Sequence, residues 1–489
     1  MFENKFLLFL ILSTILFSLA LAYQLLPLGI EGEWTWSYQS FLSNSKILFS
    51  LAVFFILIFW VKRFLDKMSN ERLDRKRELK FMVIVSLFTF FITLSLFSQN
   101  RFGLLELALI INHPGATGYL SVANKIGNIN YFLHNYLNFM PYLGVHAETH
   151  PPGIIFLFWL VLKMVAQLSF LKIWLVNSYL FWGYNLNDLV SGPGSLTFLT
   201  SGFLIGLLLP LIGSLTVFPL YYLGKELYNQ RVAVYACLLY ILIPSLIMFT
   251  PTVDQTYPFL ATFVIWLFYR GLKRGQAASF FISGILLSFG IVLSFTFLAL
   301  FAPLVILSIY SYGRFFPSKK NLFWRGIIAF LVSFAVPFGF IFLVFHLNIV
   351  TIFLKAMSIN KESYGLGTRT YSKWVSYNLY DFFSFAGLPI SLLMFKRVIS
   401  HFKEICQKRF PWDPLLVAFL VTLLFLNFSG INLGEVARLW IFLIPLLALV
   451  SAQAIKNWGS KSCFALTVVL ALQFLQAVAY KVFVRTIVY

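Results

Sequence analysis

The sequence predicts an all-α polytopic membrane protein, and three features lead to that class. Apolar runs of about 16 to 25 residues, the length that crosses a bilayer core as a helix, recur from end to end. Of the 489 residues, 60 % are hydrophobic and only 11 % are charged. The alternating polar and apolar pattern of membrane-spanning strands is missing. We therefore expect about 13 or 14 transmembrane helices with a long outer loop after the third.

The distribution of charge argues for a membrane protein and against binding to nucleic acid. The net charge of +20 would favour nucleic acid as the partner of a soluble protein. Here the lysines and arginines concentrate in short segments between apolar runs, as in the cytoplasmic loops of membrane proteins. The three cysteines are far apart in the sequence and show neither disulfide nor metal spacing.

The first three spans are expected at residues 5–26, 46–62 and 81–98, the first of them an uncleaved span rather than a signal peptide. Residues 62–80 carry eight Lys or Arg against four Asp or Glu, which predicts a cytoplasmic loop and a cytoplasmic N-terminus. Residues 99–152 then lie outside the cell membrane. A polar loop of this length is usually functional, and its middle is expected to form helices along the interface.

Further apolar runs predict the remaining spans, which lie at residues 153–170, 197–222, 233–250, 257–272, 278–312 (a two-span hairpin), 326–348, 377–394, 414–429, 439–455 and 462–480. The charge rule puts residues 150 and 254 both outside, yet three spans separate them. Either residues 172–184 also cross, or the helix after Gly153 enters the membrane without spanning it. The sequence leaves this open.

The stretch His146-Ala-Glu-Thr-His-Pro-Pro-Gly153 brings two imidazoles and a carboxylate together directly before an apolar run. The proline pair stiffens the chain and holds the residue before it out of the helical region. The ordinary explanation is a helix start at the interface with polar capping groups. The functional one is an aqueous chamber lined by His146, Glu148 and His150.

Further polar residues lie on the same predicted side of the membrane. Asp254 stands between two apolar runs, and Glu435 and Arg438 stand three residues apart at the start of another. The loop expected around residues 355–381 offers Arg369 and Tyr371. Each has an ordinary explanation, as a helix cap, a surface ion pair or a lipid contact. Their gathering beside the long outer loop favours an active chamber.

The chemistry of this set suits transfer from a lipid that carries a phosphate. A guanidinium group binds a phosphate through two hydrogen bonds, and a carboxylate or imidazole can take the proton of an attacking hydroxyl. No phosphate-binding glycine loop is present. No cofactor is required, although the His-x-Glu-x-His spacing leaves a divalent metal as an alternative.

Several short motifs resemble the GT-C superfamily of membrane glycosyltransferases, above all the protein O-mannosyltransferase and aminoarabinose-transferase branches. Residues 149–153 (Thr-His-Pro-Pro-Gly) match the start of the helix after the outer loop. Residues 221–233 are similar to the short basic connector of the family, and residues 250–258 resemble its next outer turn. The resemblance covers residues 81–455, which implies a catalytic module preceded by an extra helix pair (residues 1–80) and followed by a C-terminal helix (residues 456–489).

The resemblance implies inverting transfer of a sugar from a polyprenyl-phosphate donor to a glycan, lipid or protein acceptor on the outer face. The family's usual acid pair early in the outer loop is replaced here by Gly115-Ala-Thr-Gly118. We therefore expect Glu148, or else Asp254, to act as the base. Arg438 would hold the donor phosphate, and His150 would shape the chamber or contact that phosphate.

Two other function classes remain as alternatives. One is a flippase or transporter of polyprenyl-linked lipids. The sequence argues against it because it shows no inverted repeat and no matched pair of interrupted helices. The other is a non-catalytic membrane subunit, which the missing acid pair favours. A transferase keeps its polar residues near one face, whereas a transporter also needs them at mid-depth.

Overall fold

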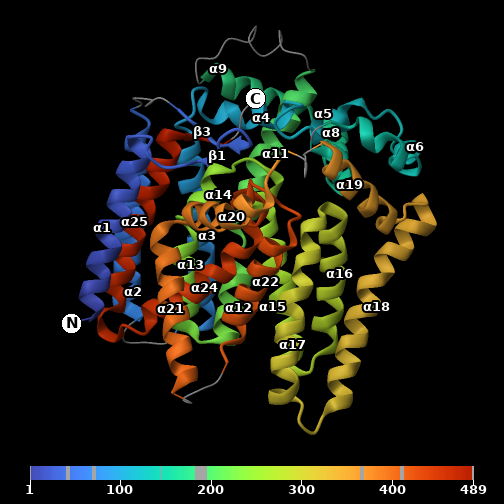
Figure 1. The fold of residues 1–489 in the computed structure, drawn as a ribbon. Coiled ribbons are helices and arrows are strands. Elements are labelled where there is room, and N and C mark those ends of the chain that lie inside the picture. The colour runs from blue at the N-terminus through green and yellow to red at the C-terminus, as the bar shows by residue number, and fades with distance from the viewer. Residues whose placement is uncertain are drawn as a thin grey trace.

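The chain folds into a bundle of helices, with short helices and two small strand pairs gathered at one end (Figure 1). The structure is a computed structural model. It describes residues 2–39, 45–68, 73–144, 146–181, 195–363, 368–407 and 412–486. The predicted all-α polytopic class is confirmed.

Seven helices within the described ranges are long and apolar enough to cross a membrane. They are α1 (Phe2–Ala22), α2 (Ile47–Met68), α3 (Arg75–Phe97), α11 (Leu196–Ser214) continued by α12 (Val217–Leu227), η5 (Phe295–Leu300) continued by α17 (Phe301–Phe315), α18 (Lys320–Phe345) and α25 (Ser462–Phe483).

Other apolar segments form shorter or interrupted helices, and two bent pairs raise the number of candidate spans to nine. The bent pairs are α8 (Gly153–Gln167) with α9 (Ser169–Phe181), and α20 (Tyr371–Ala386) with α21 (Leu388–Cys406). The shorter helices are α13 (Gln230–Tyr240), α14 (Pro244–Met248), α15 (Tyr257–Arg274), α16 (Ala277–Leu293), α22 (Pro414–Ser429) and α24 (Ile444–Lys456). The 13 or 14 spans expected from hydropathy exceed this count because helix breaks divide several apolar runs. The run at residues 233–250, for example, is split between α13 and α14.

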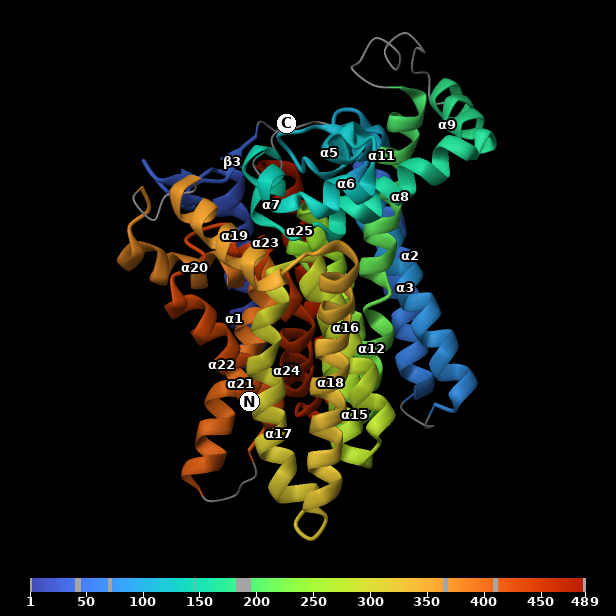
Figure 2. The ribbon, with the colours of Figure 1, turned by 90° about the vertical axis from the view of Figure 1, so that its right-hand side faces the viewer.

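The outer loop forms short helices that lie across one end of the bundle (Figures 1 and 2). They are η1 (Gly103–Leu105), α4 (Glu106–Asn112), α5 (Tyr119–Lys125), α6 (Ile129–His134), α7 (Tyr136–Phe139), η2 (Met140–Tyr142) and η3 (Ala147–Thr149). α19 (Ile349–Ser363) packs against η3 at the same end. This arrangement agrees with the helices expected along the interface.

The chain bends by 89° between α8 and α9. Both views place α9 at the end that holds α5 and the C-terminus. The helix after Gly153 therefore does not continue straight into the next segment, and both explanations for the odd number of crossings remain compatible with this bend. Of the segment 172–184, residues 182–184 lie outside the described residues.

The second break, of 115°, separates α20 from α21 at Gly387. Two glutamines of α25 satisfy the backbone groups that the break frees: Gln473 donates to Ala386 O at 3.2 Å, and Gln476 Oε1 accepts from Leu388 N at 2.7 Å. Broken helices in a membrane require such partners. The continuous span expected at residues 377–394 is thus wrong, because the helix is interrupted at Gly387.

The N-terminal segment lies against the C-terminal helix. α1 packs on α25, and α2 packs on α3 and α25. Strand β1 (Gly29–Ile30) pairs antiparallel with β2 (Trp34–Thr35), and β3 (Ser37–Tyr38) pairs with β4 (Val484–Arg485). The first 80 residues are thus integrated into the bundle, and their separation as a unit stays a prediction.

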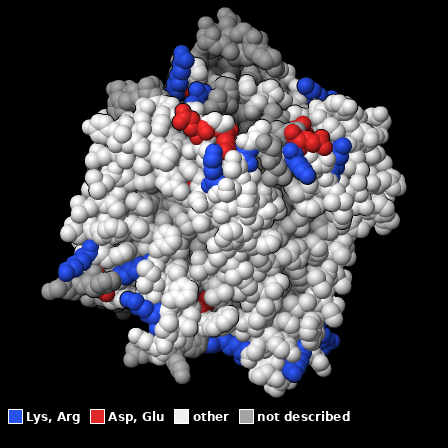
Figure 3. Space-filling model, in the orientation of Figure 1, with Lys and Arg blue, Asp and Glu red and all other residues white. Residues whose placement is uncertain are grey.

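The basic connecting segments share the end opposite to α5 and the strands (Figures 1 and 2). Ion pairs between neighbouring segments join them there, as between Lys225 and Glu78 (2.5 Å) and between Arg274 and Glu226 (3.1 Å). On the face shown in Figure 3, charged side chains gather toward the two ends, with few between them. This is the distribution that a bilayer imposes on its proteins.

Candidate functional site

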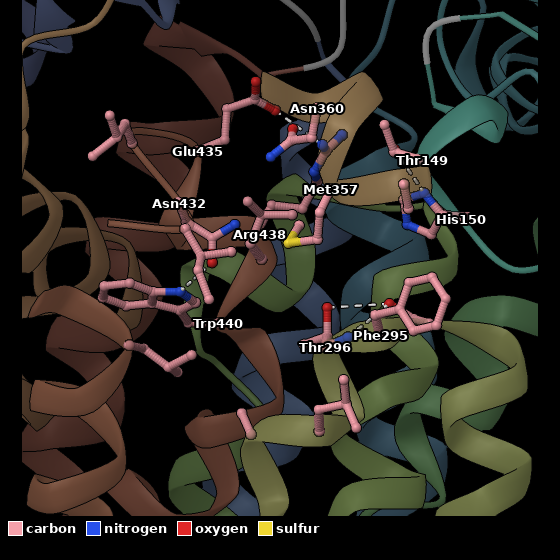
Figure 4. Close-up of a pocket in the computed structure, with 18 of the residues that line it drawn as sticks. Thr149, His150, Phe295, Thr296, Met357, Asn360, Asn432, Glu435, Arg438 and Trp440 are labelled. Atoms are coloured by element: carbon pink, nitrogen blue, oxygen red, sulfur yellow. Dashed lines mark hydrogen bonds and ion pairs between the residues drawn. The ribbon is translucent and has the colours of Figure 1, made fainter. Parts of the chain in front are cut away.

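A cavity of about 410 Å³ opens near the end of the bundle that carries the outer-loop helices. Its walls come from the turn at residues 146–150, from η5, from α19, and from residues 431–440, which include α23 (Val436–Leu439). Figure 4 shows Glu435 and Arg438 on one side of it and Thr149 and His150 on the other. Of the eight residues predicted for the site, five line this cavity: His146, His150, Arg369, Glu435 and Arg438.

Hydrogen bonds to backbone carbonyls hold the histidine turn in place. Thr149 Oγ1 donates to His146 O at 3.2 Å, and His150 Nδ1 lies 2.8 Å from the same oxygen. Tyr136 of α7 donates its hydroxyl to His150 O at 2.6 Å. The outer-loop helices thereby fix the direction in which His150 leaves the backbone.

Gly153 lets α8 begin directly against α16. A Cβ atom at this position would lie 2.3 Å from Val292 O, a distance that no side chain tolerates. With the proline pair before it, the glycine brings the histidine turn up to the end of α16 and the start of η5. The local sequence motif is thus explained by packing as well as by its polar residues.

Both histidines are neutral at physiological pH. Burial, helped by the nearby Arg438, lowers the pKa of His146 to about 3. Burial also lowers the pKa of His150, although Asp254 and the hydrogen bond to His146 O act in the opposite direction. Because a carbonyl only accepts, Nδ1 of the neutral His150 carries the proton, and Nε2 remains an acceptor. His150 is therefore suited to accept a hydrogen bond from a hydroxyl group, and its expected contact with a phosphate stays a prediction.

Arg438 lies between two carboxylates that come from different parts of the chain. Glu435 Oε2 lies 2.9 Å from Arg438 Nη2, and Asp254 Oδ2 of η4 (Val253–Thr256) lies 3.8 Å from Arg438 Nε. Burial by itself would lower the pKa of Arg438, but the two carboxylates outweigh it and the pKa is raised. The Nε atom is buried and has no hydrogen-bond partner within the described residues. The guanidinium is thus held as a cation between the two carboxylates.

Arg369 brings a second guanidinium to the cavity. It lies over the rings of Trp34 and Trp374, at 5.6 and 5.7 Å from their centres, and donates to Leu433 O. Its Nη2 lies 4.0 Å from Glu435 Oε1. Stacking on two aromatic faces restrains the planar group and favours the cation. Glu435 therefore connects the two guanidinium groups.

Sequence reasoning missed the role of Asp381, which was expected in a loop but lies in α20, 1 % exposed. Its Oδ1 accepts from Trp36 Nε1 at 2.9 Å, and its Oδ2 accepts from Ala437 N at 3.0 Å. The carboxylate thus binds the first turn of α23, where negative charge is favoured. Since α23 carries Arg438, Asp381 positions that side chain.

Glu33, in the turn between β1 and β2, was also not predicted to take part in the site. Its carboxylate accepts hydrogen bonds from Thr370 N (2.8 Å), Thr370 Oγ1 (2.7 Å), Lys373 Nζ (3.2 Å) and Trp374 Nε1 (2.7 Å). These donors, led by the backbone of Thr370, lower the pKa of Glu33 to about 2. The N-terminal hairpin thereby holds the segment that carries Arg369.

Three predicted site residues lie outside the cavity lining. Asp254 is not among the lining residues, but it lies 3.8 Å from Arg438 and close enough to His150 to act on its pKa. Glu148 is half-buried in η3, between residues that do line it. Tyr371 is 46 % exposed and donates its hydroxyl to Phe428 O at 2.8 Å, so it supports the end of α22 instead of facing the cavity. Within the described residues, no group of three or more His, Cys, Asp or Glu is placed to hold a metal ion.

The comparisons with known proteins agree with the resemblance found in the sequence. The family model described as dolichyl-phosphate-mannose-protein mannosyltransferase matches residues 196–340, a segment that contains Asp254. The comparison with curated proteins gave no match.

Solved structures of the oligosaccharyltransferase of Archaeoglobus fulgidus are also similar. The apo form is 11 % identical, with a TM-score of 0.46 over 84 % of this chain and 57 % of that one. The complex with zinc and sulfate is 16 % identical, with a TM-score of 0.44 over 78 % and 53 %. This chain thus spans just over half the length of those structures. The match over residues 196–340 confirms the resemblance to the GT-C superfamily that the sequence motifs indicated.

Proposed function

We propose that this protein transfers a sugar from a polyprenyl-phosphate donor to an acceptor on the outer face of the cell membrane, with inversion at the sugar carbon. The observation that carries the proposal is the cavity in which Arg438, flanked by Glu435 and Asp254, faces the neutral histidines of residues 146–150. The acceptor is a glycan, a lipid or a protein, and the N-terminus lies in the cytoplasm.

The two guanidinium groups are the donor phosphate ligands in this proposal. Arg438 lines the cavity as a cation held between Glu435 and Asp254. Arg369 is restrained by two indole rings and adjoins the same carboxylate, Glu435. Two guanidinium groups at one cavity favour a phosphate because they meet its oxygens with charged hydrogen bonds. His150 accepts a hydrogen bond from a sugar hydroxyl through Nε2.

Asp254 is the better candidate for the base. Glu435 already forms ion pairs with both arginines. Asp254 makes a single ion pair, at 3.8 Å, and its carboxylate accepts no hydrogen bond from a described residue. In the reaction the acceptor hydroxyl gives its proton to this carboxylate while its oxygen bonds to the anomeric carbon. The bond from that carbon to the phosphate oxygen breaks, and polyprenyl phosphate leaves with the electron pair.

The decisive experiment incubates the purified full chain with a panel of radiolabelled polyprenyl-phosphate sugars and measures release of polyprenyl phosphate. Asp254→Asn should lower the turnover rate by about 100-fold or more, as loss of a general base does. Glu148→Gln is the matched control, since it neutralises the other acid expected as a possible base and should keep most activity. Activity lost only in Glu148→Gln would make Glu148 the base.

A second variant tests the phosphate role separately. Arg438→Lys keeps the charge but cannot form two parallel hydrogen bonds, so donor affinity should fall by about tenfold. Unchanged donor affinity would remove Arg438 from the phosphate site. Donor binding by the wild type without any turnover would contradict the transferase and leave a carrier or a silent relative.

A further inference from the structure

A second cavity, of about 660 Å³, lies between α2 and α3, where α2 ends and α3 begins. This is the end of the bundle opposite to the outer-loop helices (Figures 1 and 2). Its volume is in the range that holds a small molecule or part of a lipid. Nothing in the proposed transfer reaction uses it.

Aromatic rings form one wall of this cavity. Trp60 stacks on Phe64 with ring centres 5.2 Å apart, and Phe64 stacks on Phe81 at 4.8 Å. All three rings line the cavity. They make a flat apolar surface at the edge of two membrane-spanning helices. Such a surface suits hydrocarbon and is poorly suited to a small hydrated anion.

Four cationic side chains line the same cavity. Arg63 and Lys67 come from α2, and Arg77 and Lys80 come from α3. None of the described lining residues is acidic. The buried acid closest in sequence, Glu78, is turned to other partners: it lies 2.5 Å from Lys225 Nζ and accepts from Gln230 Nε2 at 2.6 Å. The described lining of the cavity therefore carries positive charge without a compensating acid.

The outward face of α2 is apolar and uncovered by the rest of the chain. Phe55 is 65 % exposed, Ile56 60 % and Phe59 58 %. A hydrocarbon chain can therefore lie along α2 while a headgroup enters the cavity at its end. The combination of cations, aromatic wall and lipid-facing helix is typical of binding sites for anionic headgroups.

We propose that the cavity between α2 and α3 binds the headgroup of an anionic phospholipid. The phosphate is held by Arg63, Lys67 and Lys80, and the first part of an acyl chain lies on Trp60, Phe64 and Phe81. This site is independent of the transfer reaction proposed above. It would anchor the N-terminal helix pair to the leaflet on the side of the basic loops.

The test measures thermal unfolding of the full chain in neutral detergent while a lipid is added. A bound lipid raises the unfolding midpoint in proportion to its concentration relative to its Kd. Dioleoyl phosphatidylglycerol should raise the midpoint at much lower concentration than dioleoyl phosphatidylcholine. In the variant Arg63→Gln/Lys67→Gln/Lys80→Gln the apparent Kd for phosphatidylglycerol should rise by about 100-fold, because each cation near an anionic surface adds a comparable share.

The control variant, Lys319→Gln/Lys320→Gln/Arg325→Gln, removes the same charge at the turn between α17 and α18. It should bind phosphatidylglycerol like the wild type. All six side chains are exposed, so neither variant is expected to impair folding. Equal weakening in both variants would mean a diffuse attraction instead of a site. Equal effects of the two lipids, or an equal effect of inorganic phosphate, would overturn the proposal.

Discussion

Asp381→Asn tests whether a buried carboxylate outside the cavity lining sets the position of Arg438. The two oxygens of Asp381 accept from two donors, Trp36 Nε1 and Ala437 N. Asparagine keeps one acceptor oxygen and turns an NH₂ group toward the other donor. The change therefore removes one hydrogen bond to a charged group and leaves a buried donor without a partner.

The size of the effect follows from these contacts. A hydrogen bond to a charged group contributes about 1.5–3 kcal/mol, and a buried donor left without a partner costs about 1–3 kcal/mol. Because the two losses concern the same contact, we expect a destabilisation of about 3 kcal/mol. In a chain of this size the unfolding midpoint should fall by roughly 5 °C. Donor affinity should fall by about tenfold as the first turn of α23 loosens.

Asp413→Asn is the matched control, because Asp413 is equally buried but lies at the opposite end of the bundle. It accepts from Tyr228 Oη at 2.6 Å and Leu416 N at 3.2 Å, and it pairs with Arg397 at 3.3 Å. It should destabilise the chain to a similar degree and leave donor affinity unchanged. If both variants weakened donor binding equally, or if Asp381→Asn changed neither property, the positioning argument would be wrong.

Three further predictions concern stability. Gly153→Ala forces a Cβ atom against Val292 O and should destabilise the folded chain by about 1–3 kcal/mol. The control Gly313→Ala, whose Cβ atom would have nothing within 4 Å, should leave the midpoint of thermal unfolding unchanged or raise it. His146 binds a proton in the unfolded chain below about pH 6.5 but in the folded chain only near pH 3. The free energy of unfolding therefore decreases as the pH is lowered through that window. Between pH 8 and pH 5 the free energy of unfolding should fall by about 2 kcal/mol because of this residue. In His146→Gln, unfolding measured over the same pH series should lack this decrease. Because the pKa of Glu33 is lowered to about 2, the stabilisation that its carboxylate provides is complete above about pH 4.5 and is lost toward pH 2. Glu33→Gln should lower the unfolding midpoint at pH 7 and speed proteolysis of residues 28–38.

Local patterns were enough for the class of the protein and for the parts of the site that are close in sequence. Apolar run length predicts spanning helices because each helix satisfies its own backbone within the bilayer. The turn of residues 146–150 and the pair Glu435–Arg438 are formed by neighbouring residues, so spacing predicts them. The basic segments were correctly expected at one end, because charge is excluded from the bilayer core wherever the chain folds.

Contacts between distant segments could be decided only by the tertiary structure. The packing of η4 against η6 (Ile441–Leu443), which follows α23, brings Asp254 to Arg438. The hairpin of residues 29–35 brings Glu33 and Trp34 to the segment of Arg369. The bend between α8 and α9 likewise depends on neighbouring helices, because an apolar run reads the same whether it crosses or turns back. Helical periodicity is a property of one segment, whereas the partner of a buried charge depends on which segments pack together.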